Sequence, residues 1–240
     1  MPNIYLYAII DSTLVNKISS PGITNEKPYP INYKDIALIV CETESKRIEI
    51  DYENLSKHDD LVYELMKEYC VLPVAFNTII ANKADVNTFL EQNYNQIKIN
   101  FEKLSGKIEM GLKVIWDINK IKHEISSEKI KKTYFDTTTP AKLFMQKKYS
   151  EYSITSQLEN MASFIRDEIV KKLLDVCYTY KINLLQSEKI AVNGAFLIDK
   201  SKKEEFLSVL EEFKKKYTDL SLLVSGPWAP YNFIELSGEN

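Results

Sequence analysis

Residues 107–116, KIEMGLKVIW, decide how the chain divides. Every second side chain in this stretch is apolar, which predicts a strand with one buried face; these residues are Ile108, Met110, Leu112, Val114 and Trp116. The preceding segments carry longer apolar runs, and Ser105-Gly106 is typical of the end of a helix. We therefore predict a boundary at Gly106, between a domain at 1–105 and a second domain at 106–240.

The sequence before this boundary predicts an α+β domain. Two apolar runs, IYLYAII at 4–10 and IALIVCE at 36–42, indicate buried strands. A helix is expected from Ser56, with this serine as its N-cap, and a second helix from about Asp85. Between them, VLPVAF at 71–76 contains a proline, which favours an edge strand or a bulged strand.

The second domain alternates strands and helices in the order strand, helices, strand, strand, helix, strand. A helical insertion is expected at about 119–181, and two strands at 182–186 and 190–199. Ser201 and Glu204 predict a capping box for the next helix, and the last strand is expected at 219–226. This order is that of a ferredoxin-like (split βαβ) domain, here with a long helical extension.

Composition excludes several classes of protein. The chain has 240 residues, of which 45% are hydrophobic and 27% charged, which indicates a folded protein. The net charge is −3, and Arg47 and Arg166 are the only arginines, so no nucleic-acid partner is expected. No apolar run is long enough to span a bilayer, so no membrane partner is expected. The three widely spaced cysteines indicate free thiols and a cytoplasmic protein.

The motifs of common enzymes are missing from the sequence. It contains no glycine-rich phosphate loop, no Cys-x-x-Cys pair and no nucleophile elbow. His58, Asp59 and Asp60 could bind a metal in principle, but adjacent residues at a helix start point in different directions, so an acidic helix N-terminus explains them better. We therefore expect a protein that is not an enzyme, with no catalytic residues, no metal and no cofactor.

The C-terminal tail at 226–240 begins with GPWAPYNF and is rich in aromatic residues. Pro227 cannot donate a hydrogen bond, so the last strand is expected to end near Gly226. Three large rings then follow between and after the prolines: Trp228, Tyr231 and Phe233. Two hypotheses remain open, namely a clamp that packs between the domains and a hook that binds a partner.

Several stretches, taken in order, resemble the gas vesicle protein F/L family (GvpF/GvpL). They are YLYAII, DIALIVCE, LSKHDDLVYELMKEYCVLPVAFNTII, EKLSGKIEMGLKVIWD, VNGAFLIDK and VSGPWAPYNFIEL, and they cover nearly the whole chain. In one place the chain departs from the family pattern: where members often have Arg-Phe-Gly-Thr, it has Ala75, Phe76, Asn77 and Thr78.

The resemblance implies a cytoplasmic accessory protein of gas vesicle formation, associated with the vesicles. Its implied partners are the small hydrophobic shell protein (GvpA type) and other gas vesicle accessory proteins, during nucleation or growth of the shell. Such a chaperone-like assembly factor would cover apolar surface that otherwise aggregates. Two alternatives are a minor structural component of the shell and, in another class, a small-molecule-binding regulatory domain.

For the partner-binding surface we predict the helix of His58 and the edge that follows it. The candidate residues are His58, Val74, Phe76, Asn77 and Thr78. An edge strand can accept an added strand from a partner. The alternative is that this edge pairs within the sheet of its own domain.

Overall fold

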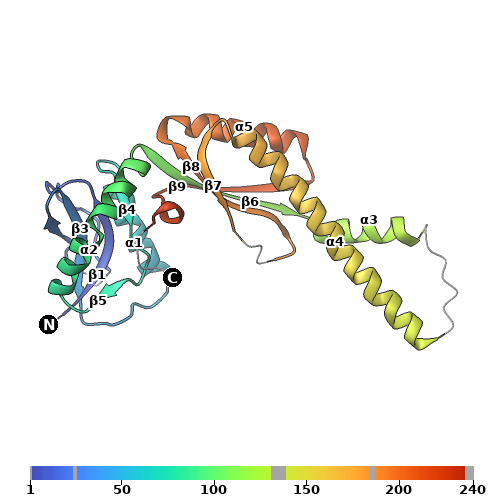
Figure 1. Cartoon of the computed structure of the whole chain (residues 1–240), viewed down its shortest axis with the longest axis horizontal. Coiled ribbons are helices and arrows are strands. Elements are labelled where there is room, and N and C mark those ends of the chain that lie inside the picture. The colour runs from blue at the N-terminus through green and yellow to red at the C-terminus, as the bar shows by residue number, and fades with distance from the viewer. Residues whose placement is uncertain (1, 24–25, 131–138, 184–186, 236–240) are drawn as a thin grey trace. The chain divides into compact units, whose positions relative to one another are not determined.

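The computed structural model describes residues 2–23, 26–130, 139–183 and 187–235 (Figure 1). The α+β class predicted from the sequence is confirmed, with two antiparallel sheets and five α-helices in the described ranges. The chain forms two compact units. One comprises the residues up to Glu109 together with the segment from Pro227, and the other comprises Met110–Gly226.

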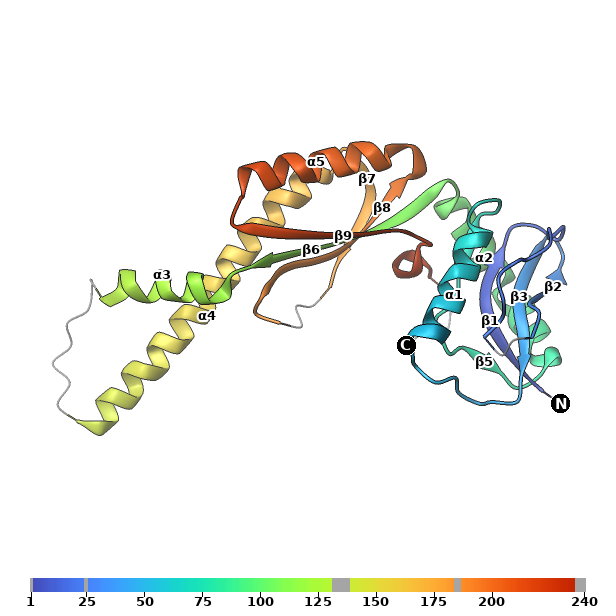
Figure 2. The same ribbon diagram turned by 180° about the vertical axis from the view of Figure 1, so that it is seen from behind.

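The first sheet has the strand order β2-β3-β1-β4, and β5 also pairs with β1. Its strands are β1 (Asn3–Ile10), β2 (Tyr29–Tyr33), β3 (Ile36–Thr43), β4 (Val71–Pro73) and β5 (Ile79–Ile80). The predicted buried strands correspond to β1 and β3. β1 is buried along almost its whole length, because α1 (Tyr52–Leu65) and α2 (Lys83–Leu104) cover opposite faces of the sheet (Figure 1 and Figure 2).

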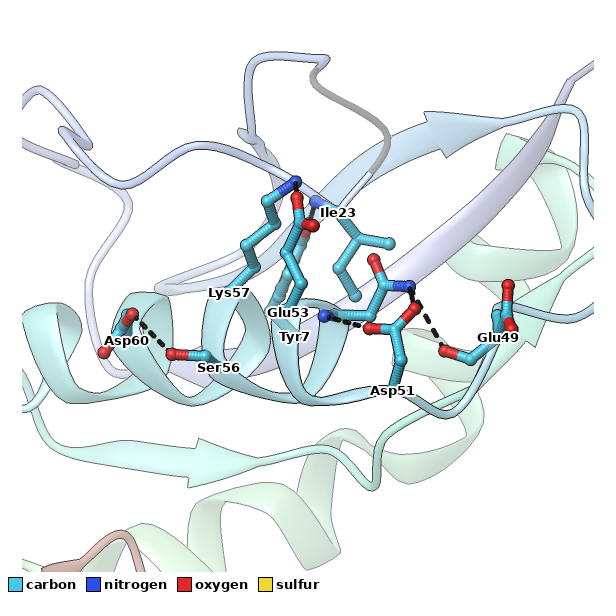
Figure 3. A network of polar contacts seen from close by, with 9 residues as sticks. Tyr7, Ile23, Glu49, Asp51, Glu53, Ser56, Lys57 and Asp60 are labelled. Atoms are coloured by element: carbon cyan, nitrogen blue, oxygen red, sulfur yellow. Dashed lines mark hydrogen bonds and ion pairs between the residues drawn. The ribbon is translucent and has the colours of Figure 1, made fainter.

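The prediction that Ser56 begins α1 was wrong. The helix begins at Tyr52, because the Asp51 carboxylate accepts a hydrogen bond from the Asn54 backbone N–H at 2.8 Å. Ser56 lies inside the helix, where its hydroxyl donates to Asp60 (Figure 3). The Asn54 side chain also donates to Asp51 and to the Glu49 carbonyl, so this helix start has two side chains that fix its entry.

The second helix also begins earlier than expected. α2 starts at Lys83 rather than near Asp85, since the Asn82 side chain accepts a hydrogen bond from the Asp85 N–H at 3.0 Å. Both errors have one cause: a cap is chosen among several polar residues, and the sequence contains more candidates than helices.

The second sheet has the order β7-β8-β6-β9. Its elements are β6 (Lys107–Trp116), α3 (Ile118–Ile130), α4 (Pro140–Leu173), β7 (Cys177–Ile182), β8 (Ile190–Asp199), α5 (Lys203–Lys216) and β9 (Leu220–Trp228). The alternation predicted for β6 is confirmed, because all five of its apolar positions are buried. α5 and the C-terminal half of α4 cover one face of this sheet (Figure 1 and Figure 2).

Three predicted boundaries in this unit were wrong. The helical region ends at Leu173, and Cys177–Ile182 forms a strand, because these residues pair with β8; of the strand expected at 182–186, residues 184–186 lie outside the described part. A 3-10 turn at Lys200–Lys202 precedes α5, which has no side-chain cap, so the capping box does not form. β9 continues to Trp228, since on an edge strand Pro227 can lack its N–H without breaking the ladder.

Candidate functional site: the edge loop and the tail

The segment that we call the edge loop, residues 74–78, interrupts the edge of the first sheet. β4 and β5 both pair with β1, and the edge loop connects them. Its two ends remain bonded to β1: the Val74 N–H donates to the Tyr7 carbonyl at 2.9 Å, and the Leu6 N–H donates to the Thr78 carbonyl at 3.0 Å. The loop therefore leaves the edge of the sheet between two points that are both hydrogen-bonded to β1.

Asn77 sets the conformation of the edge loop. Its φ angle is +70°, in the left-handed region that favours glycine, which is the residue the family pattern often has here. Asparagine tolerates this region, and its side chain adds two bonds to Ile48: Oδ1 accepts from the N–H at 2.6 Å and Nδ2 donates to the carbonyl at 2.8 Å. The Thr78 hydroxyl donates to the Ala75 carbonyl at 2.7 Å, which closes the turn.

His58, in the middle of α1, holds the edge loop by a hydrogen bond from its buried ring. Its Nε2 lies 3.1 Å from the Val74 carbonyl, which can only accept, so Nε2 carries the proton. Nδ1 then accepts from the Tyr5 hydroxyl at 2.8 Å, and that oxygen accepts from the Asn77 N–H at 3.3 Å. The result is one directed chain of hydrogen bonds from the loop, through Tyr5 and His58, back to the loop.

His58 is held neutral in this position. It is 1% exposed, the Tyr7 ring stacks on it at 5.5 Å, and Phe76 meets it edge-on at 5.8 Å. Burial lowers the pKa of His58 to about 4, and the bond to Val74 opposes this shift only in part. Both ring nitrogens are engaged, so the imidazole has no free nitrogen for a metal, and no metal-ligand cluster occurs in the described ranges.

The segment that we call the tail, residues 229–235, lies against the same unit. Asn232 bonds to Glu109 on β6, and Glu235 bonds to Asn100 on α2. The buried Tyr231 hydroxyl makes no hydrogen bond of good geometry with a described residue. Burial, followed by the nearby charge of Asp59, raises the pKa of Tyr231 above its usual range.

Asp59 connects the tail to α1. Burial raises the pKa of the Asp59 carboxyl, the charge of Asp60 raises it further, and Tyr231 opposes the shift. Burial likewise raises the pKa of Tyr5, and the nearby charge of Asp59 contributes to that shift. Three stretches that carry the family resemblance therefore meet here: the block from His58 to Thr78, the strand β6 and the tail.

The predicted site residues differ in accessibility. Val74, Phe76, Asn77 and Thr78 are partly exposed and adjacent, whereas His58 is buried beneath them. Trp228, at the end of β9, is 41% exposed, whereas Phe233 in the tail is buried. Sequence reasoning missed Tyr5, Asn100 and Glu109. Only Glu109 gave a signal, as an acidic residue inside an apolar strand.

The second unit contains a separate hollow of about 670 Å³. It lies among α3, α4 and the start of β9, and its apolar lining includes Trp116, Met161 and Phe164. At its rim, Lys120 forms an ion pair with Asp219 at 3.1 Å. Within the described ranges, no helix combines the length and apolar character needed to cross a bilayer.

The fold defines a two-unit α+β protein in which hydrogen bonds from Asn77, Thr78 and His58 hold the edge loop. The chain belongs to the family described as gas vesicle synthesis protein GvpL/GvpF, whose pattern it matches over residues 3–235. The resemblance noted in the sequence is thereby confirmed. The protein is a gas vesicle protein involved in gas vesicle formation, in a structural or assembly family generally without catalytic activity.

Individual relatives agree with this assignment. Gas vesicle protein F1 of Halobacterium salinarum is 20% identical over 238 residues, which cover 98% of this chain and 93% of the relative. The crystal structure of GvpF from Anabaena sp. PCC7120 has a TM-score of 0.83 at 21% identity and covers 100% of this chain and 99% of its own. That of GvpF from Microcystis aeruginosa has a TM-score of 0.81 at 17% identity, covering 98% and 100%. These structures share the fold.

Proposed function

We propose that this protein is a non-enzymatic assembly factor that binds the hydrophobic shell protein (GvpA type), and other accessory proteins, during nucleation or growth of the gas vesicle. The observation that carries the proposal is the edge loop, a partly exposed turn held rigid by the buried chain of hydrogen bonds through Tyr5 and His58. A rigid surface loses little conformational entropy on binding, which favours recognition. Its proposed place is the cytoplasm, in association with the vesicles.

Binding at this edge would combine backbone and side-chain contacts. β4 lies at the end of the strand order, so its outer side can receive an added strand. Pro73 limits this pairing, because it has no N–H to donate. We therefore expect Phe76 and the exposed Ala75 to supply much of the contact with an apolar partner.

The test is co-purification of this protein with the shell protein, followed by size-exclusion chromatography of the soluble fraction. Ala75→Glu puts a charge on the edge loop and should abolish a discrete soluble complex. Ala81→Glu is the matched control, since Ala81 is also exposed and follows β5, outside the loop. Equal complex formation by both variants would reject the edge loop as the binding surface, and no complex with wild-type protein would reject the assembly role.

The finer fold type is also a proposal. In chain order, β6, α4, β7, β8, α5 and β9 follow the split βαβ pattern, and the strand order β7-β8-β6-β9 agrees with a ferredoxin-like domain. α3 and the N-terminal part of α4 form the helical extension. In this proposal, the helical extension is a long insertion between the first and second strands of the ferredoxin-like domain.

The second candidate function is small-molecule binding by a regulatory domain, and the hollow beside Trp116 favours it. Its lining combines apolar side chains with polar and charged ones, among them Lys120 and Asp219, as ligand sites do. A screen of small ligands by thermal shift tests it, with Phe164→Ala expected to remove any shift. If no ligand in the screen shifts the melting temperature of the wild-type protein, the small-molecule function is rejected and the assembly role is the remaining proposal.

A further inference from the structure

The side chain of Asn100 binds the backbone of the tail. This side chain is 1% exposed on α2, and its Nδ2 donates to the Glu235 carbonyl at 2.8 Å while its Oδ1 accepts from the Glu235 N–H at 3.0 Å. The second Nδ2 hydrogen goes to the Gln96 carbonyl at 2.8 Å. The amide is thus fully bonded, and it pairs with both backbone groups of one tail residue.

Glu109 and Lys103 recognise side chains of the tail. Glu109 is 5% exposed; its Oε2 accepts from the Asn232 N–H at 2.9 Å, and its Oε1 accepts from Asn232 Nδ2 at 2.6 Å. This pair of hydrogen bonds requires a tail residue whose side chain can donate, such as asparagine. Lys103 Nζ lies 3.0 Å from the Glu235 carboxylate, which selects an acidic residue three positions later.

The docked tail also has hydrogen bonds of its own. The Tyr231 N–H donates to the Ala229 carbonyl at 2.8 Å, and the Phe233 N–H donates to the Pro230 carbonyl at 3.0 Å. Pro227 and Pro230 restrict the backbone further. Phe233 is 2% exposed and forms the apolar anchor. A short segment with a restricted backbone and one buried aromatic anchor loses little conformational entropy on binding, so it is an effective peptide ligand.

From these contacts we propose that Asn100, Lys103 and Glu109 form a peptide-recognition site for segments of the pattern Tyr-Asn-Phe-x-Glu, and that the tail of a second copy of this chain can occupy it in exchange. If the tail leaves, Asn100 and Glu109 each lose two hydrogen bonds to it, which favours a filled site. A second copy presents an identical tail. The inference does not depend on the proposed function.

The first measurement is binding of a fluorescent peptide, residues 227–235, to the full chain. Asn232→Ala with Phe233→Ala should loosen the resident tail, and this tail-deficient variant should bind the peptide at least about 10-fold more tightly than wild type, whose own tail competes at high effective concentration. Adding Asn100→Ala or Glu109→Gln should weaken binding about 10-fold or more. Asn93→Ala is the matched control, since Asn93 is also buried on α2 but bonds to the Phe89 carbonyl.

The second measurement tests exchange between copies. The tail-deficient variant is mixed with a site-deficient variant, Asn100→Ala with Glu109→Gln, which keeps an intact tail. The mixture should form a one-to-one complex by analytical ultracentrifugation, while each variant alone stays monomeric. Should a double variant fail to fold by circular dichroism, the single changes Asn232→Ala and Glu109→Gln replace it.

Two outcomes contradict the proposal. A folded tail-deficient variant that does not bind the peptide, or that binds equally well a peptide carrying both alanine changes, would overturn the recognition site. Peptide binding without any complex in the mixture would overturn the exchange between copies.

Discussion

The two units of this protein bury their interiors in different ways. The described side chains that are polar and buried all lie in the first unit, and they are Thr43, His58, Asn93, Asn100 and Glu109. The described part of the second unit has no buried polar side chain of this kind, and in its apolar core Phe196 lies 5.7 Å from Phe206. It also exposes large apolar side chains on α4, including Phe144 and Tyr152.

This difference separates specificity from stability. A hydrogen-bonded polar group in a core fixes one arrangement, because any other leaves it unsatisfied. The first unit uses such groups to hold the edge loop and the tail. The second unit depends on apolar burial, which is strong but not directional.

The largest effect is expected in the apolar core of the second unit. Phe196 is fully buried between Tyr180 and Phe206, so Phe196→Ala should lower the free energy of unfolding by about 3 to 5 kcal/mol. Urea denaturation measures the change. Phe144→Ala, at a site 60% exposed, should stay within about 0.5 kcal/mol of wild type, and a similar loss at both positions would contradict the assigned core.

The next effect is a loss of stability in acid that originates in the first unit. The folded pKa of His58 is about 4, below its usual 6.5, so the unfolded chain binds the proton more readily. The His58 contribution is complete above pH 6.5 and is lost progressively as the pH falls to 4. Between pH 7 and 5 this amounts to about 2 kcal/mol.

Denaturation of His58→Gln at both pH values measures that contribution. The variant should lose less stability than wild type between pH 7 and 5. His123→Gln is the control, since His123 is exposed, and it should behave as wild type does. An unchanged pH dependence in His58→Gln would show that other groups cause the acid sensitivity.

A smaller effect is expected from the edge loop itself. Asn77→Ala removes two hydrogen bonds to Ile48 and leaves a Cβ at positive φ without the side-chain amide that compensates for it, so it should cost about 2 kcal/mol. Asn77→Gly loses the same bonds but relieves the backbone, so it should cost about 1 kcal/mol. Thermal unfolding distinguishes them. A glycine variant less stable than the alanine variant would contradict the backbone argument.

The smallest effect concerns an exposed ion pair near α2. Asp35 accepts hydrogen bonds from Lys98 at 2.8 Å and Tyr94 at 2.6 Å, and the Lys98 bond, followed by that of Tyr94, lowers the Asp35 pKa to about 2. Lys98→Met should raise this pKa in an NMR titration. Because the pair is exposed, stability should change by less than about 0.5 kcal/mol. A loss of unfolding free energy well above that value would contradict the view that this exposed pair contributes little to stability.

Much of the architecture could be predicted from local patterns. Continuous apolar runs predicted β1 and β3, and the alternation at 107–116 predicted β6. At the start of α4, Pro140 takes the first helical position and the Thr139 hydroxyl accepts from the Lys142 N–H. These signals are local, because each depends on side chains a few residues apart.

The errors arose where neighbouring residues compete for one role. Asp51 rather than Ser56 caps α1, and a strand replaces helix at Cys177–Ile182 because β8 supplies backbone partners. The use of Pro227 inside β9 likewise depends on the strand's place at a sheet edge. Sheet pairing and edge position are properties of the whole fold, so a window of sequence does not contain them.

The sequence by itself determined the α+β class, the main buried strands and the membership of the gas vesicle family, because periodicity and ordered motifs are written along the chain. Only the tertiary structure decided the site. Tyr5 and His58 are 53 residues apart, Glu109 and Asn232 are 123 apart, and Asn100 and Glu235 are 135 apart. Hydrogen bonds form between groups that are close in space, and no local pattern encodes which distant residue will supply the partner.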